Sequence, residues 1–115
     1  KNIQYKNLTL LGDAAHPIVP FIGQGGCLAM EDAFIFGNLV IKYNSDISSA
    51  QSSYEKLRIK RIKMISKLSL RQGYLNHLSN PLIIFIRNLI MKYFSFLAMR
   101  SIKSNVWDYD PKKDT

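Results

Sequence analysis

The chain has 115 residues, of which 47% are hydrophobic, and its 16 Lys and Arg against 8 Asp and Glu give a formal charge of +8. This length allows one small core and excludes a complete two-domain enzyme. The apolar fraction excludes a disordered basic tail, and a single cysteine, Cys27, excludes an internal disulfide and a multi-cysteine zinc site. We therefore expect one folded domain, or a piece of one, in the cytoplasm.

The charge is divided unevenly along the chain. Residues 1–50 carry three basic and four acidic side chains, whereas residues 51–115 carry thirteen basic and four acidic ones. We therefore treat residues 1–50 and residues 51–115 as two parts of the chain.

The N-terminal part begins with a short apolar run, residues 8–11, which ends at Gly12. Such a run predicts a buried strand followed by a turn. Prolines and glycines then interrupt any regular element between residues 15 and 27. Apolar residues from 28 to about 43 predict a helix that is apolar nearly all round and therefore buried.

A second helix is predicted from a cap at Ser52 or Ser53 to about Gln72, just before Gly73. Four lysines on this helix lie at spacings of four, three and four and predict one solvated stripe: Lys56, Lys60, Lys63 and Lys67. No aromatic residue lies between these lysines, and no nucleic-acid-binding signature accompanies them. We therefore expect a solvated face and no nucleic-acid partner.

A third helix, from about Leu82 to Ser101, is predicted with Pro81 in its first turn. Arg87 and Lys92 interrupt its apolar stretch and oppose a bilayer span. We expect this helix to dock on a larger protein, with attachment to a membrane surface as the less favoured alternative.

The last segment, residues 106–115, predicts an irregular tail anchored by Trp107 and Tyr109.

The segment between the predicted strand and the first helix is suited to ligand binding. Amides in the first turn of a helix have no partner within the helix, and the helix dipole places roughly half a positive elementary charge there. Gly25 and Gly26 would let a flat ligand approach the backbone, and Asp13 could accept hydrogen bonds from a polyol chain. The same pattern is also typical of a turn with a purely structural role.

Residues 12–33, GDAAHPIVPFIGQGGCLAMEDA, closely resemble the second flavin-binding motif of the single-component FAD-dependent aromatic hydroxylases, the family of para-hydroxybenzoate, salicylate and kynurenine hydroxylases. The resemblance extends more loosely to Tyr54-Glu55 with Arg58 and Arg61, and to residues 107–111. It implies an α/β parent with an FAD/NAD(P)-binding domain, of which this chain would be the last quarter, mostly α with one short N-terminal strand. The family's GxGxxG fingerprint is absent, so the N-terminal ADP-binding portion of the enzyme would be a missing partner.

The resemblance also implies roles for individual residues. Asp13 would bind the ribityl chain of FAD, Pro20 would lie beside the isoalloxazine ring, and the amides of Gly25 to Cys27 would face its pyrimidine edge. The complete set of implied cofactor-binding residues is Gly12, Asp13, Pro20, Gly23, Gln24, Gly25, Gly26 and Cys27.

Other candidate residues receive structural roles. We expect no catalytic acid, base or nucleophile and no metal ligand in this chain. His16 would orient the loop, and Glu31 and Asp32 would favour the dipole at the start of the helix. His77 would be a surface histidine.

The implied function is that of an enzyme that uses FAD, NAD(P)H and dioxygen to hydroxylate an aromatic or similar planar substrate. The alternative is a truncated and inactive remnant that acts as a helical module in contact with a partner or a membrane. The missing fingerprint favours this remnant for the isolated chain, whereas the intact loop favours the enzyme for the parent.

Overall fold

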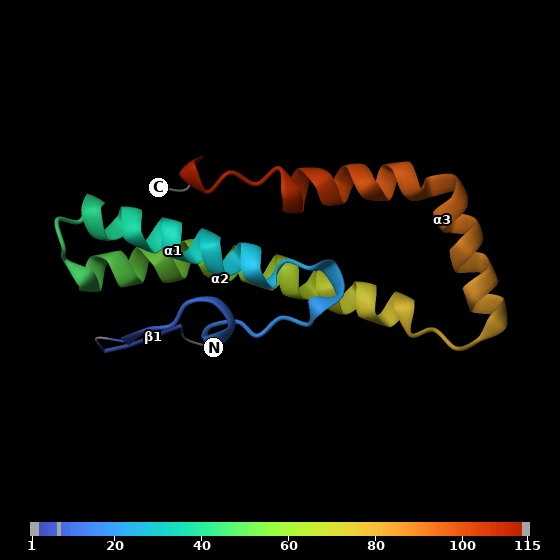
Figure 1. Ribbon diagram of the computed structural model, residues 1–115, viewed down its shortest axis with the longest axis horizontal. Coiled ribbons are helices and arrows are strands. Elements are labelled where there is room, and N and C mark those ends of the chain that lie inside the picture. Colours follow the sequence, from blue (N-terminus) through green and yellow to red (C-terminus); the bar gives the residue numbers. More distant parts are fainter. Residues whose placement is uncertain (1–2, 7, 114–115) are drawn as a thin grey trace.

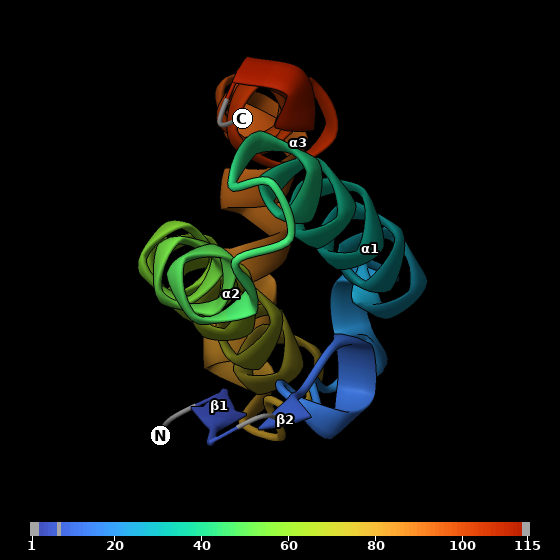
Figure 2. The same cartoon turned by 90° about the vertical axis from the view of Figure 1, so that its left-hand side faces the viewer.

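The computed structural model describes residues 3–6 and 8–113, and helices dominate it. The main elements are β1 (Gln4–Tyr5), β2 (Leu8–Thr9), α1 (Gly25–Lys42), α2 (Ile47–Asn76) and α3 (Pro81–Ile102). Helices α1 and α2 lie side by side and antiparallel, and α3 leaves the end of α2, bends and returns along the α1 side (Figure 1). Seen along this pair, the strands lie on one side and the C-terminal segment on the other (Figure 2). The expected mostly helical chain is confirmed.

The N-terminal strand expected at residues 8–11 is shorter and less buried than predicted. Strand β2 has two residues and pairs antiparallel with β1, with Tyr5 opposite Leu8. Leu8 is 57% exposed. The prediction of one buried strand is therefore wrong: within the described residues no further strand pairs with this small hairpin, and neither residue of β2 is buried.

Helix α1 begins at Gly25, three residues before the predicted start at Leu28. Its buried residues follow the helical repeat along one face: Leu28, Asp32, Ile35 and Leu39. On the opposite side Met30 and Ile41 are 68% and 76% exposed. The expectation of burial all round is wrong, since α2 and the adjoining loop cover one face of α1.

Helix α2 is longer than predicted at both ends. Asp46 caps its start, where the carboxylate accepts a hydrogen bond from the Ser49 amide at 3.3 Å, so the expected serine caps are wrong. The helix also runs through Gly73 to Asn76, which makes the predicted end at Gln72 wrong. The lysine stripe is confirmed, because all four lysines are exposed.

Two clusters of buried apolar side chains form the core. One joins the hairpin to the helix pair and contains Ile3, Ala15, Ile35, Leu39, Ala50 and Tyr54. The other contains Leu28 and Ile65 with Val106 from the C-terminal segment.

The C-terminal segment is anchored differently from the prediction. It forms a π-helical turn (Lys103–Trp107) and a 3-10 turn (Pro111–Lys113), so much of it is regular. Val106 is buried, whereas Trp107 is 54% exposed. Trp107 is therefore not an anchor, because the backbone turn directs Val106 inward instead. The predicted tail residues 114–115 lie outside the described residues.

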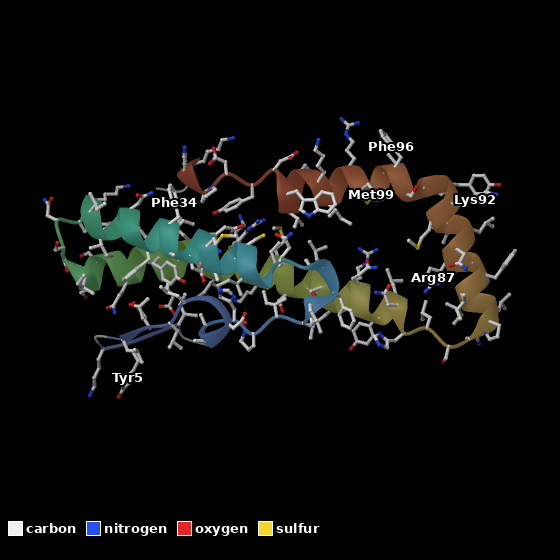
Figure 3. The ribbon with its side chains drawn as sticks, viewed as in Figure 1. Tyr5, Phe34, Arg87, Lys92, Phe96 and Met99 are labelled. Carbon is white, nitrogen blue, oxygen red and sulfur yellow. The ribbon has the colours of Figure 1, made fainter. Side chains whose placement is uncertain are left out.

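Helix α3 begins as predicted, with Pro81 in the first turn and Asn80 accepting a hydrogen bond from the Leu82 amide at 3.0 Å. Its large apolar side chains are exposed along its length, as Phe96 and Met99 show in Figure 3. Among the residues that the structure describes, no helix combines the length and the apolar character of a membrane span.

Candidate functional site

Two glycines shape the loop that leads into α1. Gly12 opens a 3-10 turn, η1 (Gly12–Ala14), and Gly23 closes another, η2 (Pro20–Ile22). Their φ angles are +56° and +65°, in the left-handed region that favours glycine. A Cβ on Gly12 would also lie 3.0 Å from the Ala29 Cβ. These two glycines, both predicted cofactor-binding residues, are required by the fold itself.

The start of α1 is open to solvent. Gln24 at the N-cap offers no side-chain hydrogen bond, and the helical pattern begins with the Leu28 amide, which donates to the Gln24 carbonyl at 2.9 Å. In the part of the chain that the structure describes, the amides of Gly25, Gly26 and Cys27 have no acceptor. The predicted free amides are therefore present, at the helix end where the dipole favours negative charge.

Asp13 lies at this helix start. A Cβ built on Gly25 would be 3.8 Å from the Asp13 Oδ1, and a Cβ on Gly26 would meet nothing within 4 Å. The Asp13 side chain is exposed. The structure thus brings together the predicted carboxylate and the predicted bare backbone, and leaves open space over Gly26.

The other predicted site residues follow along the same loop. Pro20 is exposed and begins η2, and Cys27 is exposed in the first turn of α1. Gln24 lies between Gly23 and the helix. All eight predicted residues therefore belong to the two short turns and the helix start, and of these the helix start is the part that lies beside Asp13.

A buried carboxylate on α1 holds the Asp13 turn in place. Asp32 is fully buried, and its Oδ2 accepts hydrogen bonds from the Gly12 amide at 2.9 Å and from the His16 Nε2 at 2.5 Å. The Arg58 Nε donates to Asp32 Oδ1 at 2.6 Å. Burial opposes ionisation of Asp32, but the bonds from His16 and Gly12 and the charge of Arg58 keep its pKa below the usual value.

The predicted role of Asp32 at the helix dipole is therefore wrong, because its carboxylate lies inside a polar cluster. His16 is buried in the same cluster, in agreement with its predicted role in orienting the loop. The signal that could have indicated this cluster is the spacing of Arg58 and Arg61, which lie on the face of α2 opposite the lysines.

The cluster continues to the C-terminal segment. Glu31 forms an ion pair with Arg58 NH2 at 2.9 Å and accepts a hydrogen bond from Arg61 NH2 at 3.0 Å. Arg61 also donates to the Val106 carbonyl at 3.1 Å, and its guanidinium lies 3.9 Å from the centroid of the Tyr109 ring. Tyr109 is thus the predicted tail anchor that the structure confirms, and Glu31 is an ion-pair partner instead of a dipole residue.

The far end of the loop rests on α2. The Ser69 hydroxyl donates to the Val19 carbonyl, and the Phe21 ring lies against Gly73, where a Cβ would be 2.5 Å from a ring carbon. Phe21 also meets the ring of His77 edge to face. His77 is exposed, as predicted. Gly73 is a packing glycine rather than the end of the helix.

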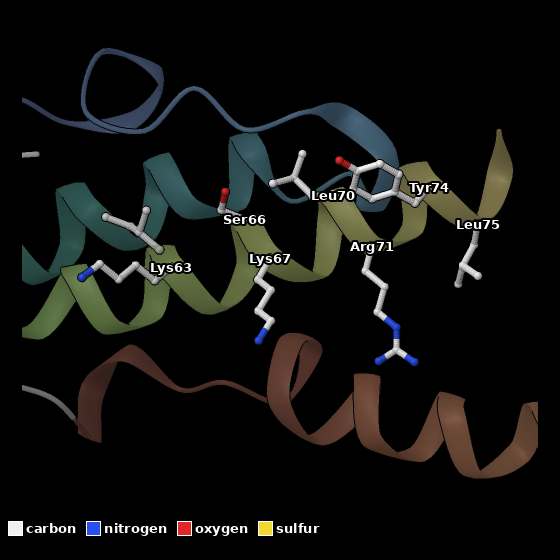
Figure 4. A pocket seen from close by; sticks show the side chains of 8 residues that line it. Lys63, Ser66, Lys67, Leu70, Arg71, Tyr74 and Leu75 are labelled. Atoms are coloured by element: carbon white, nitrogen blue, oxygen red, sulfur yellow. The ribbon is translucent and has the colours of Figure 1, made fainter. Parts of the chain in front are cut away.

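Hollows lie along α2 and at the start of α1. One, of about 640 Å³, lies along α2 with side chains that include Lys67, Arg71 and Leu75 (Figure 4). The other, of about 460 Å³, lies between α1 and the C-terminal segment, and Cys27 and Trp107 are among its lining residues. The first borders the predicted lysine stripe, and the second borders the start of α1.

Comparison with curated proteins finds relatives that are named as monooxygenases and hydroxylases. The chain is 39% identical over 71 residues to 3-amino-4-hydroxybenzoate 2-monooxygenase of Streptomyces platensis, covering 62% of the chain and 18% of the relative. It is 39% identical over 83 residues to kynurenine 3-monooxygenase of Sus scrofa, covering 70% and 17%. It is 48% identical over 56 residues to FAD-dependent urate hydroxylase of Klebsiella pneumoniae, covering 49% and 14%.

The chain therefore resembles part of the FAD-dependent aromatic hydroxylases and monooxygenases, which confirms the resemblance drawn from residues 12–33. It spans less than a quarter of the length of the curated relatives it matches. No protein-family model matches the chain, and no solved structure matches it.

Proposed function

We propose that this chain is the C-terminal, FAD-binding part of a monooxygenase that uses NAD(P)H and dioxygen to hydroxylate an aromatic or similar planar substrate. The observation that carries the proposal is the position of the Asp13 carboxylate beside the uncapped glycine start of α1. The names of the relatives, which include hydroxybenzoate, kynurenine and urate as substrates, support this reaction class.

The residues present fit FAD. Asp13 accepts hydrogen bonds, as the hydroxyls of a ribityl chain require, and Gly25 and Gly26 carry no Cβ that would keep a planar ring from the backbone. The free amides from Gly25 to Cys27 suit the negative charge that a flavin ring acquires on reduction. The chemistry that the cofactor supplies is reduction by NAD(P)H and activation of dioxygen.

The role of the residues in this chain is to bind the cofactor and to fix its orientation. Amides in the first turn of α1 stabilise negative charge, and they are fixed in advance because they belong to a helix of 18 residues. Pro20 and Gly23 set the path of the loop that enters the helix. No proton transfer is assigned to His16, since its Nε2 is engaged by Asp32.

We also propose that the rest of the FAD-binding domain, an α/β fold with the ADP-binding portion, packs on α3. The relatives are several times longer than this chain, and the apolar side chains of α3 are exposed. The hollow along α2 leaves space that further side chains would fill. The two parts, residues 1–50 and 51–115, then belong to one cytoplasmic domain, since Asp32 and Arg58 join them.

Flavin content tests this proposal. The full-length protein should purify yellow, or take up FAD as the apoprotein, and should consume NAD(P)H and oxygen with an aromatic substrate. The 115-residue chain alone should bind FAD weakly, because it lacks the ADP-binding portion. A full-length protein that neither contains nor takes up FAD would overturn the proposal and favour the inactive helical module.

A further inference from the structure

We propose that Asp32 is a positioning residue for flavin binding: its buried carboxylate grips the backbone and side chain on either side of Asp13 and so fixes the Asp13 carboxylate at the start of α1. This inference rests on the proposed function, and it concerns a residue that does not itself touch the cofactor.

One oxygen of the Asp32 carboxylate makes two hydrogen bonds to the segment around Asp13. Asp32 Oδ2 accepts from the Gly12 amide at 2.9 Å and from His16 Nε2 at 2.5 Å. Gly12 directly precedes Asp13, and His16 follows it by three residues. The short turn that carries Asp13 is therefore tied to α1 at both of its ends.

The tie is on the same helix as the free amides. Asp32 is buried on α1, seven residues after Gly25. Because an α-helix is rigid over two turns, a turn bound to Asp32 keeps a constant position relative to the start of α1. The 3.8 Å between Asp13 Oδ1 and the Cβ position of Gly25 is thus set from within one helix.

Arg58 makes this carboxylate compatible with an anion site. An uncompensated charge on Asp32 would repel Asp13 and weaken the positive potential of the helix start. The Arg58 Nε donates to Asp32 at 2.6 Å, and Arg58 and Arg61 together also pair with Glu31. Two carboxylates face two guanidinium groups, so the cluster holds the turn without adding net charge.

A double-mutant cycle in the full-length protein separates positioning from general stabilisation. Asp13→Ala alone should weaken FAD binding at least about tenfold, through the loss of hydrogen bonds to an ionised acceptor. Asp32→Asn alone should weaken it by several-fold to about tenfold. If Asp32 acts through Asp13, adding Asp32→Asn to Asp13→Ala should change the dissociation constant by less than about twofold.

Substitutions of His16 test the same positioning role with a milder change. His16→Ala removes one of the two points held by Asp32, and should weaken FAD binding several-fold. His16→Gln keeps an N–H donor for Asp32 and should restore the affinity to within about twofold. Should Asp32→Asn not fold, His16→Ala takes its place in the cycle with Asp13→Ala.

Asp46→Asn is the matched control. It also replaces a carboxylate by an amide, but Asp46 is exposed and caps α2 at the opposite end of the helix pair. It should change the melting temperature little, because asparagine caps helices about as well as aspartate does, and it should leave FAD affinity unchanged.

The results distinguish a failure of the proposed flavin site from a failure of the positioning role of Asp32. Unchanged affinity in Asp13→Ala would remove Asp13 from the proposed flavin site. Weakened binding in Asp13→Ala together with no effect of Asp32→Asn, or with effects that add fully, would refute the positioning role and leave the proposed function standing.

Discussion

Among single residues, the glycines of the loop divide into two kinds. Gly12 and Gly23 have positive φ angles and serve the turns. Gly25 and Gly26 have no positive φ angle, and an added Cβ would meet nothing within 4 Å at Gly26 and only the Asp13 Oδ1, at 3.8 Å, at Gly25. Only the second kind can be substituted without backbone strain, so a substitution there reports on the site and not on the turns.

Gly25→Val should therefore abolish or strongly weaken FAD binding while the chain remains folded. The valine side chain would occupy the space over the free amides, and its cost in a first helical turn is small. FAD titration of the full-length protein, together with circular dichroism, measures both effects.

Gly37→Val is the matched control, because Gly37 lies on the same helix with nothing within 4 Å of its Cβ position. It should leave FAD affinity intact. Equal affinity in Gly25→Val and the parent protein would mean that the glycines at the helix start serve only the turn.

The ionisation of Asp32 should make stability depend on pH. The folded chain holds its pKa below the ordinary value of 3.8, so the ionised carboxylate stabilises the fold at pH values above 3.8. This contribution is lost as the pH falls through the lowered pKa of the folded state. Asp32→Asn should be less stable at pH 6–7, and its free energy of unfolding should fall less steeply with acid. Chemical denaturation from pH 3 to 7 checks this, and parallel curves would contradict it.

At the level of elements, α2 presents two different cationic faces. The lysines lie on the solvent side, whereas Arg58 and Arg61 are buried. Arginine suits the buried side because its planar group forms several directed bonds, and lysine suits solvent because its ammonium is strongly hydrated. The helix therefore uses one face for solubility and the other for holding the loop and the C-terminal segment.

Gly73→Ala should loosen the loop from α2. The new Cβ would lie 2.5 Å from the Phe21 ring, so the ring must move, and we expect a loss of about 1 kcal/mol in the free energy of unfolding. Gly37→Ala, with open surroundings in α1, should instead be neutral or stabilising by up to about 1 kcal/mol. Thermal unfolding of both variants measures the difference, and similar melting temperatures would exclude a packing role for Gly73.

The sequence predicts those elements whose signals are local. Pro81 with Asn80, the four exposed lysines and the helix after Gly25 follow from residues near one another in the chain. Which face of α1 is buried could not be predicted, because the surface that covers it comes from other elements.

In the candidate site, too, the sequence predicts what depends on neighbouring residues and misses what depends on contacts between distant ones. The free amides and the acid at Asp13 are visible in a motif of 22 residues. The hydrogen bonds of Asp32 are not visible in the motif, because Arg58 lies 26 residues away. In the sequence alone, an acidic residue near the start of a helix is expected to interact with the helix dipole. Only the packing of α1 on α2 decides that Asp32 faces inward.

For the whole molecule, α3 is the element that determines solution behaviour. Its large apolar side chains are exposed along its length. Arg87 and Lys92 would each cost roughly 2.5–3.5 kcal/mol at the centre of a bilayer. We therefore expect the isolated chain to self-associate, and the full-length protein to be recovered in the soluble fraction at low salt.

Cell fractionation checks this expectation. Retention of the full-length protein through an alkaline carbonate wash, which removes peripheral proteins, would contradict docking of α3 on the rest of the enzyme. Recovery of the isolated chain as a stable monomer would contradict the need for any covering surface.

The turn between α1 and α2 lies at the opposite end of the helix pair from the loop that carries Asp13 (Figure 1). Asn44 and Ser45 adopt positive φ angles there, a conformation that costs side-chain-bearing residues about 1 kcal/mol or more. The contacts that join the two helices, above all Asp32 with Arg58, run across the pair and not through this turn. The covalent connection at this turn is therefore not what holds the two helices together. We expect a nick or new termini at Ser45 to leave two halves that still associate through their charge and shape. The turn is thus a suitable place to divide the chain for a split reporter or a circular permutant.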